Sequence, residues 1–146
     1  MGKTETAKLF AEQGIPVFDS DAAVHELLGS GGAAVALVEK EFPGVLVEDH
    51  IDRKFLGEKV VSDDLALARL EKILHPMVTG MRNSFIRNIT SDMVLFDIPL
   101  LFEKEYQGHC DYIVVVSAPE EVQKKRVLER PGMPEERYNE ILSQQL

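Results

Sequence analysis

The first residues of the chain include a tripeptide that can bind phosphate. Gly2, Lys3 and Thr4 match the last three positions of the loop G-x-x-x-x-G-K-[ST], and a helix-forming run follows them directly. In such a loop, backbone N–H groups surround the phosphates, the lysine reaches the β and γ phosphates, and the hydroxyl binds Mg²⁺. Such a short tripeptide also occurs by chance, and the alternative interpretation is a solvated N-terminus.

Three aspartates lie where apolar runs end. Asp19 and Asp21 follow the run IPVF, and Asp97 follows the run MVLF. Open parallel sheets bind ligands beyond the carboxyl ends of their strands. Carboxylates at that place can accept a proton from a substrate hydroxyl and can hold Mg²⁺ or its waters, and phosphoryl transfer requires both. The alternative is turn chemistry, in which Asp19 ends the strand and Ser20 or Asp21 caps the following helix.

Two arginines, a histidine and a cysteine are the remaining candidates. Arg126 and Arg130 share one helix face, so they could close over a triphosphate and neutralise its developing charge. A solvated helix face is the alternative for this pair. From its position alone, His75 favours a structural role at a helix end, and Cys110 favours that of a small buried side chain. No His/Cys cluster has the spacing of metal ligands.

The helices and strands that must position these residues can be predicted from the spacing of apolar residues and from the Gly, Pro and Asp residues that mark their ends. The spacing predicts a helix that ends at Gly14 and then a buried strand. Residues 20–89 read as five helices without a strand, one capped by Asp63 and the next beginning at Pro76. Two further strands and two further helices are predicted within residues 93–103, 111–119, 119–130 and 133–146. Continuous apolar strands that alternate with helices predict a parallel α/β sheet covered on both sides.

The composition indicates one folded domain and excludes two classes of protein. The 146 residues are 45% apolar and 28% charged, which is typical of a globular chain. A net charge of −9 and a pI near 4.9 argue against an extended basic face for nucleic acid, so a phosphate site must be local. The longest apolar run, YIVVVSA, is far shorter than the ~20 residues of a membrane-spanning helix. Without a signal segment, we expect a cytoplasmic protein.

The order of these motifs resembles the dephospho-coenzyme A kinase family. The loop end, first helix and strand of residues 2–27 lead into an Asp-x-Asp motif, and IDRKFL, LHPMV, DIPLLFE and QKKRVLER follow in the order of that family. The resemblance covers essentially the whole chain. It implies a three-layer α/β fold of the P-loop NTPase type, with a parallel sheet, a helical acceptor-binding insertion and a helical lid.

The resemblance also implies a reaction. Members of the family use ATP and Mg²⁺ to phosphorylate the ribose 3′-hydroxyl of dephospho-coenzyme A, the final step of coenzyme A synthesis. The implied partners are dephospho-coenzyme A and ATP, with no nucleic acid and no membrane. We expect a monomer or a weak oligomer.

Residues on the donor side of the reaction are implied by position. Gly2, Lys3 and Thr4 match the phosphate loop of the family, and Thr4 is implied as a magnesium ligand. Lys3, Arg126 and Arg130 are implied as catalytic residues, because the two arginines match the pair at the lid.

Residues on the acceptor side are implied in the same way. Asp21 matches the acid taken as the general base, while Asp19 and Asp97 match acids near the acceptor and the metal, Asp97 directly or through water. His75 and Pro76 match a motif of the acceptor-binding insertion.

The resemblance sets domain boundaries and shows departures. The kinase core is expected at residues 1–20 and 90–119, the acceptor-binding insertion at 21–89, and a core helix with the lid segment at 120–146. Family members often carry an arginine where this chain has Thr79, with Arg82 one turn later. We also expect that the first strand and glycine turn of the family, and its last strand and helix, are missing from this sequence.

Two alternatives remain at this point. One is another small-molecule kinase of the same fold, acting on a nucleoside monophosphate or a sugar, although the LHPMV motif within a helical insertion argues against it. The other is a non-catalytic remnant that binds coenzyme A or dephospho-coenzyme A.

We predict that residues 1–146 alone do not turn over substrate. A phosphate loop acts through successive backbone N–H groups held at a strand-to-helix turn, and only its last residues are present here. The measurement is magnesium-dependent ADP release with dephospho-coenzyme A, compared with a form extended at both ends. Comparable turnover by the two forms would contradict this prediction.

Overall fold

The computed structural model describes residues 2–61, 63–98, 108, 110–129 and 132–143, apart from the side chains of residues 137, 140, 141 and 143. The chain divides into two compact units, which we describe separately. The central unit comprises residues 15–97, and the terminal unit comprises residues 1–14 and 98–146.

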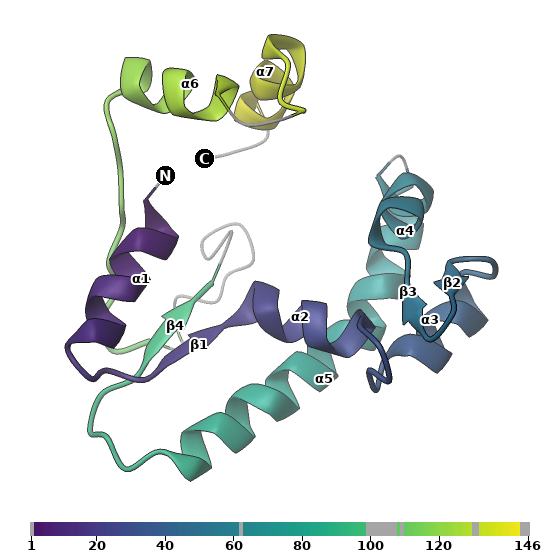
Figure 1. Ribbon diagram of the computed structural model, residues 1–146, viewed down its shortest axis with the longest axis horizontal. Helices are drawn as coiled ribbons and strands as arrows, with labels where there is room; N and C mark the ends of the chain where they lie inside the picture. Colours follow the sequence, from purple (N-terminus) through teal and green to yellow (C-terminus); the bar gives the residue numbers. More distant parts are fainter. Residues whose placement is uncertain (1, 62, 99–107, 109, 130–131, 144–146) are drawn as a thin grey trace. The chain divides into compact units, whose positions relative to one another are not determined.

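The central unit holds the strands assigned among the described residues together with four helices (Figure 1). Its strands are β1 (Val17–Asp19), β2 (Leu46–Val47), β3 (His50–Ile51) and β4 (Leu95–Asp97). Its helices are α2 (Ser20–Leu28), α3 (Val35–Glu41), α4 (Arg53–Val60) and α5 (Asp64–Asn88). The terminal unit holds α1 (Lys3–Glu12), α6 (Glu120–Leu128) and α7 (Glu135–Ser143).

Strands β1 and β4 confirm the parallel pairing that the apolar runs predict. They lie side by side, with Val17, Phe18 and Asp19 opposite Leu95, Phe96 and Asp97. The expected helix end at Gly14 is also confirmed, because α1 ends at Glu12 and Gly14 follows with a φ of 80°. An α/β fold with a parallel sheet is therefore present.

The last of the three predicted strands, at residues 111–119, is wrong for this structure. No strand is assigned there, and the side chains of Tyr112 and Val115 are 91% and 69% exposed. A strand is stabilised by hydrogen bonds to a neighbouring strand and by burial of its faces. Within the described part of the chain, no segment pairs with this run.

A hairpin interrupts the stretch for which only helices were predicted. Strands β2 and β3 pair antiparallel, with Leu46 opposite Ile51 and Val47 opposite His50. Glu48, in the loop between them, has a φ of 53°, a left-handed conformation that suits tight turns. The strands have two residues each, so their apolar alternation is too short to separate from a helical pattern.

The two helices predicted on either side of Pro76 form one continuous helix, α5, of 25 residues. A proline inside a helix removes one N–H donor, but the turns on both sides keep their own hydrogen bonds. Ala66, Leu70 and Leu74 are buried along α5 and hold it against the rest of the central unit. Burial of this apolar stripe therefore outweighs the local cost of the proline.

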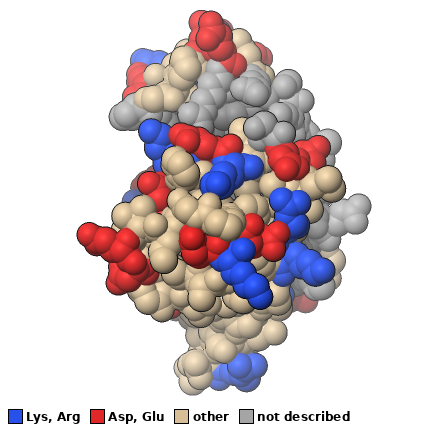
Figure 2. Space-filling model, turned by 90° about the vertical axis from the view of Figure 1, so that its right-hand side faces the viewer, with Lys and Arg blue, Asp and Glu red and all other residues tan. Residues whose placement is uncertain are grey.

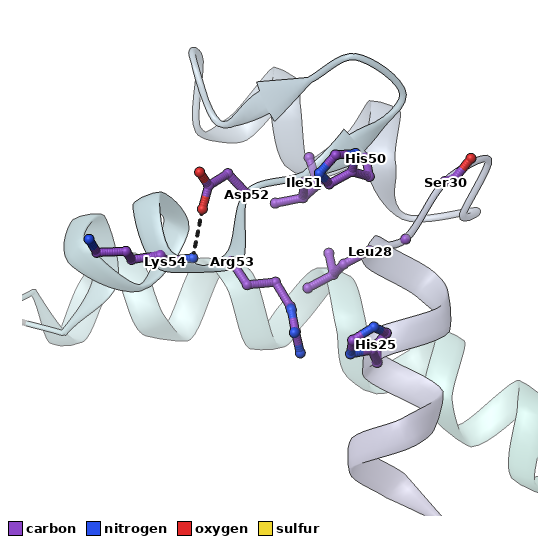
Figure 3. Close-up of a pocket in the computed structure, with 9 residues that line it drawn as sticks. His25, Leu28, Ser30, His50, Ile51, Asp52, Arg53 and Lys54 are labelled. Atoms are coloured by element: carbon purple, nitrogen blue, oxygen red, sulfur yellow. Dashed lines mark hydrogen bonds between the residues drawn. The ribbon is translucent and has the colours of Figure 1, made fainter. Parts of the chain in front are cut away.

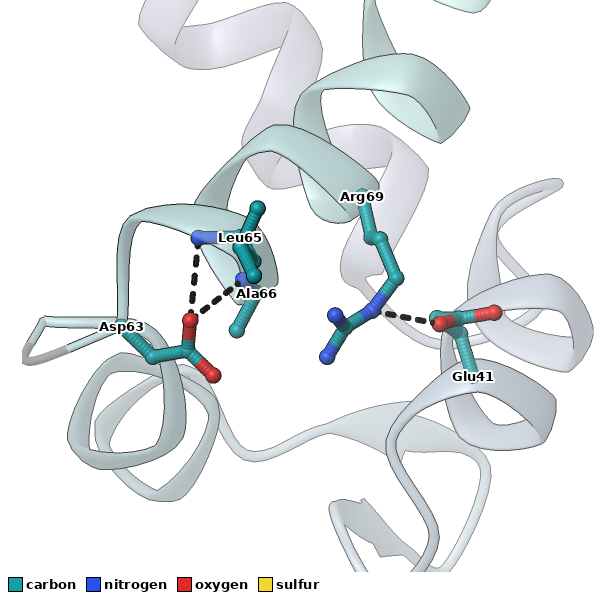
Figure 4. Close-up of polar contacts among 5 residues, drawn as sticks. All are labelled: Glu41, Asp63, Leu65, Ala66 and Arg69. Atoms are coloured by element: carbon teal, nitrogen blue, oxygen red, sulfur yellow. Dashed lines mark hydrogen bonds and ion pairs between the residues drawn. The ribbon is translucent and has the colours of Figure 1, made fainter.

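The start of α5 is fixed by the cap that the sequence predicts. The Oδ1 atom of Asp63 accepts hydrogen bonds from the backbone N–H groups of Leu65 and Ala66, at 2.9 and 3.0 Å (Figure 4). One turn further along, Arg69 pairs with Glu41 of α3 at 2.8 Å. These contacts tie the first turns of α5 to the end of α3.

The core of the central unit is formed by helices α2 to α5 and the hairpin. It buries twelve apolar residues: Leu27, Leu28, Ala34, Val38, Phe42, Val45, Ile51, Leu56, Val60, Ala66, Leu70 and Leu74. On the face shown in Figure 2, acidic and basic side chains are interspersed and form no single basic patch. No helix in the described part of the chain is both long enough and apolar enough to cross a membrane.

One carboxylate joins α3 to the loop before the hairpin. The Glu39 side chain accepts hydrogen bonds from the backbone N–H groups of Gly44, Val45 and Leu46, at 2.9, 3.1 and 2.8 Å. These bonds, above all the one from Gly44, hold the pKa of the Glu39 carboxyl below its ordinary value of 4.5. The charged form of Glu39 is therefore favoured in the folded state.

We predict that Glu39→Gln lowers the melting temperature at pH 7, because an amide oxygen accepts these bonds less strongly than a carboxylate does. Since the folded-state pKa is lowered, the stabilising contribution of Glu39 is full above about pH 4.5 and is lost as the pH falls through the folded-state value. Thermal unfolding of the variant should therefore depend less on pH below 4.5. Glu58→Gln, at an exposed position of α4, is the control, and equal effects of both changes would contradict the prediction.

Candidate active site

The end of the phosphate-binding loop lies at the start of α1 in the terminal unit. Gly2 precedes the helix with a φ of 112°, and its carbonyl accepts a hydrogen bond from the Thr6 N–H at 2.8 Å. A Cβ atom on Gly2 would come within 3.2 Å of Cγ1 of Val116. Both the backbone conformation and this close approach favour glycine. Lys3, half-buried, and Thr4, exposed, are the first residues of the helix.

The register of the parallel strands brings two of the predicted acids together. Asp19 and Asp97 are paired positions at the ends of β1 and β4, and neighbouring strands lie about 4.8 Å apart. Their environments differ, because Asp97 is only 5% exposed whereas Asp19 is exposed. The carboxyl edge of the sheet therefore carries adjacent carboxylates, as the sequence predicts.

Helix α2 starts directly at this edge. The Oδ1 atom of Asp19 accepts the N–H of Ala22 at 3.0 Å, so Asp19 both ends the strand and caps the helix. The sequence allowed for Ser20 or Asp21 as the cap, and the structure gives this place to Asp19. Asp21 is exposed in the first turn of α2, where the positive end of the helix dipole stabilises a carboxylate.

An aromatic cluster supports this edge from the side of α5. The ring of Phe18 lies 5.5 Å from Phe85 and 6.4 Å from Phe96, measured between ring centroids. The guanidinium of Arg82 lies over the Phe96 ring at 5.9 Å. Because Phe18 and Phe96 immediately precede Asp19 and Asp97, this packing fixes the backbone that carries the acids.

A cavity of about 510 Å³ opens beside Asp19, between the β1–α2 segment and the second half of α5. Phe18, Met81 and Phe85 give it an apolar side, and Glu26 and Asn88 give it polar groups. Sequence reasoning did not select these α5 residues, because they look like an ordinary amphipathic helix.

A second cavity, of about 570 Å³, lies between the end of α2 and the segment from the hairpin to α4 (Figure 3). Its polar lining comes from six side chains, those of His25, Ser30, His50, Asp52, Arg53 and Lys54. Figure 3 shows the Arg53 and His25 side chains extending toward the same space. The IDRKFL motif was the sequence signal near this cavity, but the motif alone assigned no role to Arg53.

The remaining predicted residues are not brought to these cavities. His75 and Pro76 lie in the middle of α5, are exposed, and line neither cavity. Arg126 is exposed on α6 of the terminal unit. Arg130 lies outside the described residues, so the structure does not describe the arginine pair.

Metal binding has to be judged from the types of donor that are present. Among the described residues, no three His, Cys, Asp or Glu side chains gather as a metal site. Mg²⁺ does not require such a cluster of protein ligands, because it is usually held by one or two carboxylates, several waters and substrate phosphates. The carboxylate of Asp97 and the hydroxyl of Thr4 are each, taken singly, an oxygen donor of the kind that Mg²⁺ binds. The described residues form no closed protein cage for a metal.

Comparison with known proteins decides the family. The family model described as CoaE, dephospho-CoA kinase, matches residues 1–146. The chain belongs to the dephospho-CoA kinase family. A dephospho-CoA kinase of Mesorhizobium japonicum is 49% identical over 149 residues, covering 100% of this chain and 75% of that protein. A dephospho-CoA kinase of Novosphingobium aromaticivorans is 48% identical, covering 100% of this chain and 73% of that protein.

A solved structure supports the same fold. The crystal structure of TT1252 from Thermus thermophilus matches with a TM-score of 0.87 at 31% identity, covering 99% of this chain and 74% of that one.

Proposed function

We propose that this protein transfers the γ-phosphoryl group of ATP to the ribose 3′-hydroxyl of dephospho-coenzyme A, giving coenzyme A. The observation that carries the proposal is the match of the dephospho-CoA kinase family over residues 1–146. The register pair Asp19 and Asp97 supports it independently, because it provides carboxylates at the sheet edge where phosphoryl-transfer enzymes bind substrates.

We assign the donor phosphates to the start of α1. The backbone N–H groups after Gly2 and the Lys3 ammonium would hold the phosphates, since a helix N-terminus and a lysine both favour negative charge. Arg126 and Arg130 would neutralise charge that develops on the transferred group. Phosphoryl transfer needs little covalent participation from the protein, so positioning and charge account for most of the rate.

We assign the acceptor hydroxyl to Asp21. Its carboxylate is exposed and accessible to a substrate, so it would take the proton of the 3′-hydroxyl as that oxygen attacks phosphorus. Asp19, already engaged as the helix cap, would orient the acceptor. Mg²⁺, when bound, supplies charge neutralisation between the phosphates, and Asp97 and Thr4 would hold it directly or through water.

We assign residues 21–89 to acceptor binding, with His75 and Pro76 on α5 as contacts for the acceptor. Residues 1–20 and 90–119 would form the kinase core, and residues 120–146 a core helix and the lid. The assignment of residues 21–89 is supported by the apolar core that forms between Leu27 and Leu74, and the other assignments rest on the family resemblance.

Two measurements test the proposed reaction. A form of this chain, extended with the flanking segments of the Mesorhizobium japonicum relative, should release ADP with dephospho-coenzyme A and not with nucleoside monophosphates or sugars. Turnover with those acceptors instead would favour another small-molecule kinase. Binding of dephospho-coenzyme A by the extended form, without turnover, would favour a non-catalytic remnant.

We predict that Asp21→Asn in that extended form lowers kcat by roughly 100-fold or more and changes acceptor binding little. Asparagine keeps the shape of aspartate but cannot take the hydroxyl proton. Steady-state kinetics at saturating ATP measure the effect. Asp19→Asn is the matched comparison, and a larger loss of kcat from Asp19→Asn would show that the two acids have exchanged roles.

A further inference from the structure

The cavity between α2 and α4 is lined by two cationic side chains, Arg53 and Lys54, that the proposed chemistry has not used. Arg53, the first residue of α4, lines this space with His25 of α2. In the part of the chain that the structure describes, the Arg53 guanidinium has no carboxylate partner, whereas Arg69 pairs with Glu41. The guanidinium of Arg53, on an exposed residue beside a cavity of about 570 Å³, is therefore accessible to an anionic ligand.

Asp52, which lines the cavity, and Asp49, three residues before it, are engaged with other groups. Asp52 accepts hydrogen bonds from the backbone N–H groups of Lys54 and Phe55, at 2.9 and 3.1 Å, and so caps α4 (Figure 3). Asp49 accepts a hydrogen bond from the Ser30 hydroxyl and lies 3.7 Å from Nδ1 of His50. The acids around the cavity therefore serve the local fold, and the guanidinium stays available to an anion.

Helix geometry links this cavity to the proposed reaction. His25 lies four residues after Asp21 in α2, so the two share one helix face and are separated by about 6 Å along the axis. In a ribose 5′-diphosphate, the 3′-oxygen and the first phosphorus are separated by a comparable span. An acceptor with its 3′-hydroxyl at Asp21 can thus place its diphosphate beside His25.

We propose that Arg53 and His25 bind the 5′-diphosphate of the acceptor nucleotide. The planar guanidinium can donate two parallel hydrogen bonds to phosphate oxygens, and the imidazole can donate a third. The cavity volume lies within the range of small-molecule sites, about 300–1,000 Å³. The site selects nucleoside diphosphate derivatives over acceptors without a diphosphate. This inference rests on the proposed function, because it takes Asp21 as the contact of the 3′-hydroxyl.

Calorimetric titration of the 146-residue chain with dephospho-coenzyme A tests the inference. Arg53→Met should weaken binding by about 10- to 100-fold, the effect expected on loss of a bidentate charge-assisted contact. Lys40→Met is the matched control, because it removes the same charge from an exposed residue of α3 that lines neither cavity. Lys40→Met should leave the affinity within about twofold.

A second variant and a folding control complete the test. His25→Gln should also weaken binding, by several-fold, and circular dichroism should show that all three variants remain folded. Equal affinities of Arg53→Met and the unaltered chain, or equal losses from Arg53→Met and Lys40→Met, would overturn the diphosphate site and leave the proposed function intact. Turnover of dephospho-coenzyme A by the extended form, without binding by the 146-residue chain, would also overturn the diphosphate site and leave the proposed function intact.

Discussion

The central unit depends on the parallel pairing of β1 with β4. These strands lie near the two ends of residues 15–97, so three register pairs close the intervening chain into one loop. The entropic cost of closing a loop rises only slowly with its length, and four helices and a hairpin can therefore be accommodated between the strands. The same pairing aligns Asp19 with Asp97 and starts α2 at the sheet edge. The pairing of β1 with β4 therefore determines both the closure of the central unit and the position of its carboxylates.

Local signals predicted the elements well where the outcome depends on neighbouring residues. The cap at Asp63 and the helix end near Gly14 needed only side-chain chemistry and backbone freedom over a few residues. The errors arose where distant contacts decide. Pro76 stays within a helix because a buried stripe holds both halves, and residues 111–119 form no strand because no described segment pairs with them.

In the candidate site, too, the residues placed by local patterns could be predicted, whereas those placed by distant contacts could not. Apolar runs ending in acids were enough to select Asp19, Asp21 and Asp97, because parallel strands bring their ends to one edge. Arg53 and His25 were not selected, since their shared cavity arises only when the hairpin packs against α2 and α3. The spacing of residues along the chain does not show that Arg53 and His25 line the same cavity, although the IDRKFL motif contains Arg53.

The exposed run that includes Ile113, Val114 and Val115 has a consequence for the behaviour of the chain in solution. Its backbone N–H and C=O groups lie outside the strand ladders that the described residues form, and its side chains are β-branched and largely in contact with water. Such a segment can form strand pairs with the same segment of another copy of the chain. The rate of this first pairing step rises with the square of the protein concentration. The net charge of −9 opposes that encounter by mutual repulsion, and added salt weakens the repulsion. Dilute, low-salt solutions therefore favour the separated chain.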